Sequence, residues 1–89
     1  MYKIFRTTSF KKDYKKLSSK DKVLVKETIK ILSNGNNLPK SYKDHKLIGD
    51  YLNCRECHIK PDLLLIYRIE HETLELALIR IGSHSRLFK

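Results

Sequence analysis

Four consecutive large aliphatic residues, Leu63 to Ile66, constrain the fold of this chain more than any other feature. Successive side chains of a β-strand point to opposite faces of a sheet, so a strand that is apolar at every position needs cover on both faces. Residues 63–69 are therefore expected to form a central strand. Two further β-type runs and two short connections flank it, at residues 51–59 and 73–81 and at residues 60–62 and 70–72. Together they predict an antiparallel meander of three strands.

The amino-terminal part of the chain has the spacing of helices. Residues 2–6 alternate like a short strand, and apolar residues then recur at i, i+4 and i+7 from Phe10 to Leu17, as in an amphipathic helix. A second helix is expected from about residue 20 to residue 33, where Asn34-Gly35 supplies a left-handed stop. The residues of this helix that we predict to face inward are Leu24, Thr28, Ile31 and Leu32.

One domain accounts for the whole chain, residues 1–89, because a chain of this length buries too little surface to build two separate cores. The order of the predicted elements is β-α-α-β-β-β. We therefore predict an α+β domain in which the helical hairpin packs on one face of an antiparallel sheet. Between the helices and the meander, residues 36–46 are expected to form a polar loop of about ten residues.

Positive charge is concentrated in the first half of the chain. The chain has 19 basic and 10 acidic residues, a net charge of +9, and residues 1–46 carry the whole excess. Such an excess favours a polyanionic partner, such as nucleic acid, an acidic protein or an anionic membrane. The lysines of the predicted helices form a solvated face that supplies salt-sensitive attraction to phosphate without sequence preference.

The apolar runs of the chain are short. The longest, Leu63 to Tyr67, is far below the ~20 residues that span a bilayer, and the amino terminus lacks the apolar core of a signal peptide. We therefore expect a cytoplasmic protein without membrane attachment.

Cys54 and Cys57 form a C-x-x-C pattern. Alternation along a strand places residues three apart on opposite faces, which suits neither a disulfide nor a shared metal ion. We therefore interpret both as packed thiols rather than as a redox pair or a zinc site.

Four histidines, at positions 45, 58, 71 and 84, bring groups that RNA cleavage can use. RNA can be cut without a metal or a cofactor if three groups act on it. One group removes the proton of the 2′-hydroxyl, another protonates the leaving 5′-oxygen, and a cation stabilises the phosphate. Histidine suits both proton transfers because its ordinary pKa of about 6.5 lies close to neutral pH. The neighbours of each histidine indicate whether it has such a role.

His84 lies in the segment from Arg80 to Phe88, which follows the last predicted strand. Arg80 can hold a phosphate with two hydrogen bonds, His84 can transfer a proton, and Phe88 can stack on an unpaired base. Gly82 lets the backbone turn between them. The same segment can also be a polar tail in which Phe88 closes the edge of the core, and spacing alone does not choose between the two.

His58 lies beside two carboxylates. Strand alternation places Glu56 and His58 next to each other on one face, and Asp62 follows in the turn. A carboxylate beside an imidazole orients the ring and stabilises its protonated form, as a general acid or base requires. The alternative is a solvated polar face. His45 lies in the polar loop, where a lone histidine is more often a surface residue, and His71, in a turn between two glutamates, is given no role.

Three elements of the chain occur together: Asp44-His45 with Leu47 and Gly49, Arg55 to Asp62, and Arg80 to Phe88. Together they resemble the YafQ branch of the RelE/ParE toxin superfamily, over nearly the whole chain and with the same order of strands and helices. The resemblance implies an mRNA interferase, the toxin of a type II toxin-antitoxin pair. Such a toxin is an endoribonuclease that cleaves messenger RNA, typically in the ribosomal A site, and is neutralised by a cognate antitoxin.

The resemblance also implies a role for each matched position. His84 is the general acid or base, Arg80 clamps the phosphate and the transition state, and Phe88 positions the nucleotide. We expect neither a metal nor a cofactor. Leu63 departs from the family pattern, in which tryptophan often follows the aspartate. The remaining catalytic candidates are His45, His58 and Asp62, with Glu56 as an orienting partner, and the further candidates for substrate binding are Arg55, Lys46 and Ser83.

The sequence leaves two other functions open. A toxin of the same fold that resembles ParE would block gyrase by binding it, but such an inhibitor has no need of several proton-transfer groups near an arginine. A basic RNA-binding protein would keep the lysines of the helices and would be indifferent to His84. For the toxin, we expect an acidic antitoxin that covers the positive first half of the chain.

Overall fold

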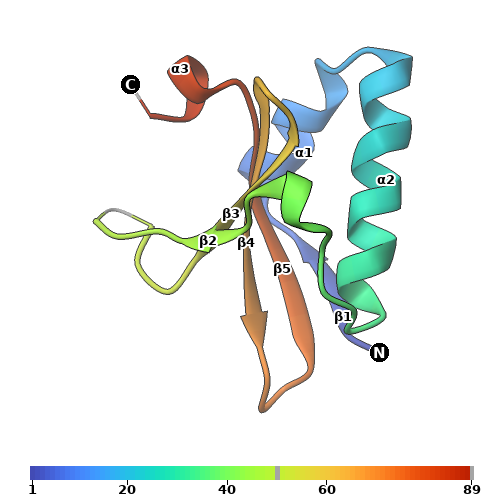
Figure 1. The fold of residues 1–89 in the computed structure, drawn as a ribbon, viewed down its shortest axis with the longest axis vertical. Coiled ribbons are helices and arrows are strands. Elements are labelled where there is room, and N and C mark those ends of the chain that lie inside the picture. Colours follow the sequence, from blue (N-terminus) through green and yellow to red (C-terminus); the bar gives the residue numbers. More distant parts are fainter. Residues whose placement is uncertain (50, 89) are drawn as a thin grey trace.

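The fold combines a five-stranded sheet with helices on both of its faces. A computed structural model describes residues 1–49 and 51–88. In Figure 1, α1 and α2 lie on one side of the sheet and α3 on the other. No helix in these described ranges is long and apolar enough to cross a membrane. The elements in chain order are β1 (Lys3–Arg6), α1 (Thr8–Lys15), α2 (Ser19–Ser33), the 3-10 helix η1 (Lys40–Tyr42), β2 (His45–Lys46), β3 (Arg55–Lys60), β4 (Leu63–Glu70), β5 (Glu75–Gly82) and α3 (His84–Leu87).

Strand β4 lies at the centre of the sheet. The strand order is β1-β5-β4-β3-β2, and every residue from Leu63 to Tyr67 is buried. The prediction of a central strand with both faces covered is therefore confirmed. The meander β3-β4-β5 is antiparallel as expected, with Glu56 opposite Ile66 and Arg68 opposite Ala77.

The sheet is mixed, so the prediction of a purely antiparallel sheet was wrong. β1 pairs with β5 in parallel, with Lys3 opposite Glu75. The helical hairpin returns the chain to the start of β1, where the Tyr2 amide donates to the Ser33 carbonyl at 2.8 Å. The direction of β1 therefore depends on contacts between distant parts of the chain, which a local sequence pattern does not encode.

Three short elements, η1, β2 and α3, were not predicted; η1 and β2 lie in the segment 36–46 that was expected to be a loop. Two predicted strands begin later than expected. The strands expected at residues 51–59 and 73–81 start at Arg55 and Glu75. In both cases the chain first passes through a left-handed residue, Asn53 with φ 67° or Leu74 with φ 54°. The first residues of each β-type run therefore form a turn instead of a strand, since a left-handed residue cannot continue a strand.

α2 spans nearly the residues that the sequence predicts, but it presents a different face to the sheet. Thr7 and Ser18 are the N-caps, and each side chain accepts a hydrogen bond from an amide of the first turn. Leu24 and Ile31 were expected to face inward and are only half-buried. The sequence of α2 offers two overlapping apolar stripes, and contact with the sheet selects one of them. The buried residues are Val25, Thr28, Ile29, Leu32 and Ser33.

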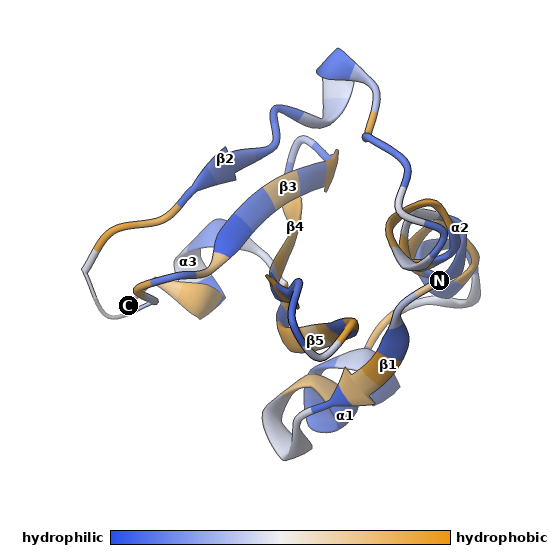
Figure 2. Ribbon diagram, turned by 90° about the horizontal axis from the view of Figure 1, so that it is seen from below, coloured by the Kyte–Doolittle hydropathy of each residue, from blue (hydrophilic) through white to orange (hydrophobic). Residues whose placement is uncertain are grey.

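Two apolar clusters cover the sheet, one on each face. Figure 2 shows α2 and α3 on opposite sides of the strands. The larger cluster lies beneath α1 and α2, where Phe10, Val25 and Ile29 pack against side chains of β4 and β5. The smaller cluster lies beneath α3 and residues 47 and 51–54. Its buried members are Cys54, Leu64, Ile66 and Leu87, with Leu47, Tyr51, Ile79 and Phe88 packed around them.

The two cysteines belong to different clusters, which confirms that they lie on opposite faces. Cys57 is in the larger cluster and Cys54 in the smaller one, and both are buried and free. Burial raises the pKa of the Cys57 thiol to about 12, with further contributions from the charges of Asp44 and Glu56. Cys57 is therefore a packed thiol that stays protonated at neutral pH.

A buried carboxylate closes the edge of β5 where β1 ends. There the Thr7 hydroxyl donates to the Ile79 carbonyl at 2.8 Å, and the Ile81 amide donates to Oδ2 of Asp13 at 3.2 Å. Asp13 also accepts two hydrogen bonds from Arg80, at 2.7 and 3.2 Å. α1 thus takes the place of a neighbouring strand, and these donors replace the water that a buried carboxylate loses.

We predict that Asp13→Asn lowers the free energy of unfolding by about 2 kcal/mol, because the buried pair with Arg80 loses its charge while the side chain keeps its shape. Asp21→Asn is the matched control, since Asp21 pairs with the half-exposed Lys60 at 2.9 Å and loss of such a pair costs about 1 kcal/mol or less. Urea unfolding followed by circular dichroism measures both variants. Equal losses would contradict the role given to Asp13.

Candidate active site

Three candidate residues, His45, Glu56 and His58, are in direct contact and are called the histidine cluster below. His45 on β2 lies opposite Glu56 on β3, and His58 is two residues further along β3, so all three side chains share one face. The Nε2 atoms of His45 and His58 lie 3.5 and 3.4 Å from Oε1 of Glu56. Glu56 is buried, so its carboxylate is shielded from water and held between two imidazoles.

The segment after β5 brings His84 and Phe88 to the turn between β3 and β4. The Ser83 side chain caps α3, and the His84 amide donates to Oδ1 of Asp62 at 3.3 Å. The rings of His84 and Phe88 lie 5.0 Å apart, and Phe88 meets Tyr51 edge to face at 5.9 Å. Phe88 packs at the rim of the smaller cluster, as expected of a residue that closes the edge of the core, and its ring lies beside that of His84.

The strand register places these segments on one face of the sheet. Leu64 and Ile66 of β4 belong to the smaller cluster beneath α3. Residues directly opposite each other on neighbouring strands share a face, so the partners of these two residues on β3 and β5 also face α3. The two rows across the sheet are His58-Leu64-Gly82 and Glu56-Ile66-Arg80.

Arg80 ends its row at the edge of the sheet, where it pairs with Asp13. Its Nε lies 2.7 Å from Oδ2 of Asp13, and 26% of its side chain is exposed. The hydrogen bond that Arg80 donates to Asp13 raises the pKa of Arg80 against the opposing effect of burial, and Tyr51 adds a smaller rise. Asp13 thus anchors one side of the guanidinium, and the exposed part of its planar fork can hold a phosphate.

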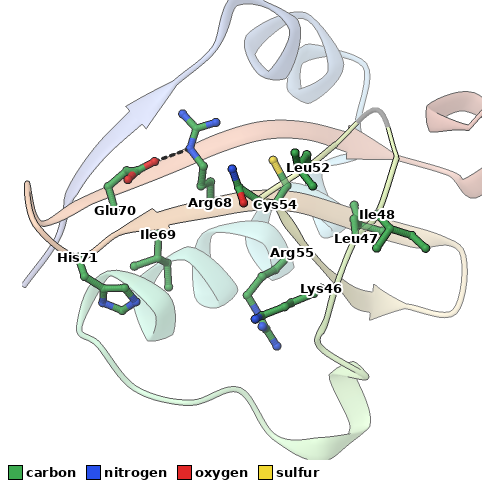
Figure 3. Close-up of a pocket in the computed structure, with 11 residues that line it drawn as sticks. Lys46, Leu47, Ile48, Leu52, Cys54, Arg55, Arg68, Ile69, Glu70 and His71 are labelled. Atoms are coloured by element: carbon green, nitrogen blue, oxygen red, sulfur yellow. Dashed lines mark ion pairs between the residues drawn. The ribbon is translucent and has the colours of Figure 1, made fainter.

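Arg55 and Lys46, two candidates for substrate binding, lie on the other face. They are cross-strand partners on β3 and β2, one residue away from the histidine cluster, so their side chains point away from it. Figure 3 shows them side by side in a cavity of about 530 Å³, which the exposed Ile48 and Leu52 also line. The structure therefore does not bring these two basic residues to the histidines.

Asp44 joins Arg55 to the buried Tyr67. The Tyr67 hydroxyl donates to Oδ1 of Asp44 at 2.6 Å, and Nε of Arg55 lies 3.2 Å from both carboxylate oxygens. Burial raises the pKa of the Tyr67 phenol, and the hydrogen bond with Asp44 raises it further. The hydrogen bond with Asp44 also raises the pKa of Arg55. Both residues therefore keep their protons and remain donors to Asp44.

Some residues near the candidate site were not singled out from the sequence. Tyr51 supports Phe88, and the Lys43 carbonyl accepts a hydrogen bond from Nδ1 of His45 at 2.8 Å. Lys43 also lines a groove of about 430 Å³ with His58 and Lys60. For Lys43 and Lys60 the sequence does carry a weak signal, because each lies two positions from a candidate histidine. For Tyr51 it carries no signal, because the contact with Phe88 joins distant segments of the chain.

His71, which was given no role, lies in the turn after β4, at the end of that strand away from Asp62. Its Nδ1 is 3.2 Å from the Tyr2 hydroxyl. In the part of the chain that the structure describes, no group of three or more His, Cys, Asp or Glu side chains is arranged to hold a metal ion.

The face beneath α3 thus carries imidazoles, a partly anchored arginine and an aromatic ring. Imidazoles can accept and donate protons, and the arginine can stabilise negative charge on a phosphate. Phe88 offers a surface on which a base can stack. This combination suits acid–base cleavage of a phosphodiester in RNA.

The family and the relatives that this chain matches in sequence are described as YafQ toxins. Residues 2–89 match the family described as the bacterial toxin of type II toxin-antitoxin system, YafQ. The putative toxin YafQ of Haemophilus influenzae is 43% identical over 60 residues, which are 65% of this chain and 59% of that protein. The mRNA interferase toxin YafQ of Escherichia coli K12 is 38% identical over 58 residues, 65% of this chain and 61% of that protein. The chain therefore matches less than two thirds of the length of these relatives.

Solved structures with the same fold match this chain almost from end to end. A copper-bound mutant toxin from Helicobacter pylori superposes with a TM-score of 0.88 at 41% identity and covers 99% of this chain and 100% of its own. YafQ in the Escherichia coli DinJ-YafQ toxin-antitoxin complex superposes with a TM-score of 0.84 at 32% identity, over 99% of this chain and 98% of its own. The predicted RelE-like α+β fold is therefore confirmed.

We predict that Tyr67 makes the protein lose stability above about pH 10, the ordinary pKa of a phenol. The pKa of Tyr67 is raised in the folded state, so its contribution is complete below that pH and is lost as the pH rises toward the folded pKa. From pH 8 to pH 11, wild type should lose about 1 kcal/mol more unfolding free energy than Tyr67→Phe. Urea unfolding at the two pH values measures this, and equal losses would refute it.

Proposed function

This chain belongs to the YafQ family of bacterial toxins of type II toxin-antitoxin systems, and we propose that it is an endoribonuclease that cleaves messenger RNA. The observation that carries the proposal is the contact of two imidazoles with one buried carboxylate, on the face of the sheet that also presents Arg80 and leads into His84. A relative from Escherichia coli is named an mRNA interferase toxin. The proposed place of action is the cytoplasm, where messenger RNA is translated.

The proposed reaction is a transfer within the RNA strand. The ribose 2′-hydroxyl attacks the adjacent phosphorus, the bond from phosphorus to the 5′-oxygen breaks, and a 2′,3′-cyclic phosphate and a 5′-hydroxyl result. One imidazole accepts the proton of the 2′-hydroxyl and another protonates the leaving oxygen. His84 performs one of these transfers and the histidine cluster the other. Because side chains supply both protons and charge, we propose that the reaction needs no metal or cofactor.

Several residues position the substrate and the reacting groups in this proposal. Arg80, anchored by Asp13, binds the non-bridging phosphate oxygens as negative charge develops on them. Phe88 stacks on the base, with Tyr51 behind it. Asp62 fixes His84 through the backbone amide. The Ser83 hydroxyl, at the start of α3, lies close enough in sequence to His84 to contact the same nucleotide.

We propose further that cleavage takes place in the ribosomal A site. The support is electrostatic: lysines on α1 and α2 give the side of the protein away from α3 a strong positive charge. A ribosome presents RNA phosphates on many sides of a bound protein, so a basic surface remote from the cleaved strand contributes to binding.

The proposed antitoxin is an acidic protein that covers the groove between α1 and α2. Phe10, Tyr14 and Ile29 form the apolar floor of this groove. An acidic segment with apolar anchors would match both the floor and its positive rim. The YafQ relative from Escherichia coli forms a complex with the antitoxin DinJ. The basic residues around the groove are Arg6, Lys11, Lys15 and Lys26.

A non-enzymatic toxin that blocks gyrase, or a basic RNA-binding protein, would need the fold and the charge but no cluster of imidazoles. Burying the Glu56 carboxylate between two histidines costs desolvation energy. A surface that acts only by binding a partner does not need this unfavourable arrangement. The histidine cluster therefore favours the nuclease.

We predict that His84→Ala lowers RNA cleavage by roughly two to four orders of magnitude, the usual contribution of an acid–base group, while the fold and RNA binding stay nearly intact. His71→Ala is the matched control, because His71 lies away from the candidate site. This variant should cleave RNA at the wild-type rate. Single-turnover cleavage and filter binding measure the two effects. Undiminished cutting by His84→Ala would remove His84 from the mechanism.

We predict that the antitoxin binds through charge. Its affinity should fall as salt rises from about 0.05 to 0.5 M, because screening weakens attraction between exposed charges. Lys11→Glu, in the α1–α2 groove, should weaken binding by at least roughly tenfold, whereas Lys40→Glu on η1, outside the groove, should change it little. Titration calorimetry with the purified antitoxin measures both. Binding that is equal at low and high salt would count against an acidic partner on this surface.

A further inference from the structure

We propose that Asp44, held by Tyr67 and Arg55, is a positioning residue that sets the place of the His45 imidazole. The proposal rests on the proposed function, since it assumes that His45 takes part in RNA cleavage. It assigns Asp44 and Tyr67 a function that the sequence did not suggest, and it gives Arg55 a role other than binding RNA.

Strand β2 is too short to hold His45 by itself. It consists of His45 and Lys46, both exposed, and pairs with β3 at only these two positions. The chain enters β2 through Lys43, whose φ of 50° lies in the left-handed region. That conformation costs a lysine about 1 kcal/mol or more, so contacts around it must hold the backbone there. The short strand therefore needs an anchor.

Asp44 supplies this anchor from the opposite face of the sheet. Alternation along the backbone directs Asp44 toward the helix side and His45 toward α3. The Tyr67 hydroxyl, at 2.6 Å, ties the carboxylate to β4, the most buried strand, and Arg55 ties it to β3. Hydrogen bonds to a charged group are among the stronger ones in proteins, so this anchor is stiff.

The residues on both sides of Asp44 define the position of the imidazole. Nδ1 of His45 donates to the Lys43 carbonyl at 2.8 Å, and Nε2 lies 3.5 Å from Oε1 of Glu56. Because Lys43 and His45 flank Asp44 directly, a shift of Asp44 moves both the ring and the carbonyl that orients it. Half of the His45 side chain is exposed, so packing does little to restrain the ring.

The anchor also explains the position of Arg55. Its Nε and Nη2 both lie 3.2 Å from Asp44 oxygens, and its side chain points away from the histidine cluster. An arginine engaged in this way stabilises a carboxylate rather than a phosphate. Its conservative replacement, Arg55→Lys, would lose the planar fork and keep the charge.

The test compares RNA cleavage by Tyr67→Phe and Asp44→Ala. We expect kcat to fall roughly tenfold and roughly a hundredfold, with KM within about twofold of wild type, because a small displacement of a proton-transfer group slows the reaction without weakening binding. Thr28→Val is the matched control: it removes a buried hydroxyl that donates to the Leu24 carbonyl at 2.9 Å in α2, and it should leave kcat unchanged. Unchanged kcat in Asp44→Ala would overturn the proposal.

A double-mutant cycle separates positioning from general stability. If Asp44 acts through His45, adding Asp44→Ala to His45→Ala should lower kcat by less than about twofold, because the ring that Asp44 positions is already absent. A full hundredfold loss in that background would show that Asp44 acts in another way and would overturn the proposal.

Nuclear magnetic resonance tests the anchor without reference to activity. In Tyr67→Phe the ring signals of His45 should shift, and the Leu47 amide, which donates to the Cys54 carbonyl at 2.9 Å, should exchange at least roughly tenfold faster. Amides shared by β4 and β5 should be unaffected. Unchanged His45 and Leu47 signals would overturn the anchor. Wild-type protein that leaves RNA uncut, with these signals altered as expected in the variant, would instead refute the proposed nuclease alone.

Discussion

The burial of β4 on both faces is the constraint on which the rest of this structure depends. Leu63 to Tyr67 are all at most 4% exposed, so each face of the sheet needs its own apolar cover. α1 and α2 cover one face, and residues 47 and 51–54 with α3 cover the other. The second cover carries the residues around His84. The candidate active site is therefore built from elements that also shield the central strand.

Three carboxylates connect the functional groups to this scaffold. Asp13 ties α1 to β5 and to Arg80, Glu56 lies between the imidazoles of β2 and β3, and Asp44 ties β2 to Tyr67. Asp13 and Glu56 are buried, and a buried carboxylate is costly unless donors surround it. The polar contacts of all three carboxylates restrain the orientation of their partners as well as their position. The apolar clusters cannot do this, because hydrophobic contact has no preferred direction.

Much of the fold could be read from local patterns. The extent of α2, the central strand and the opposite faces of the two cysteines follow from spacing and residue type, which act over a few residues. The parallel pairing of β1, the buried stripe of α2 and the short β2 did not follow. Each depends on a surface that forms only when distant segments meet.

The candidate site divides in the same way. By itself the sequence determined which groups are available for chemistry and that Glu56 and His58 share a face, because alternation along one strand is a local property. Only the tertiary structure decided that His45 joins them, that Arg80 is anchored by Asp13, and that Arg55 holds Asp44. The reason is physical: a side chain's partner across a sheet is set by strand order and register, and these minimise the free energy of the whole fold rather than of any one segment.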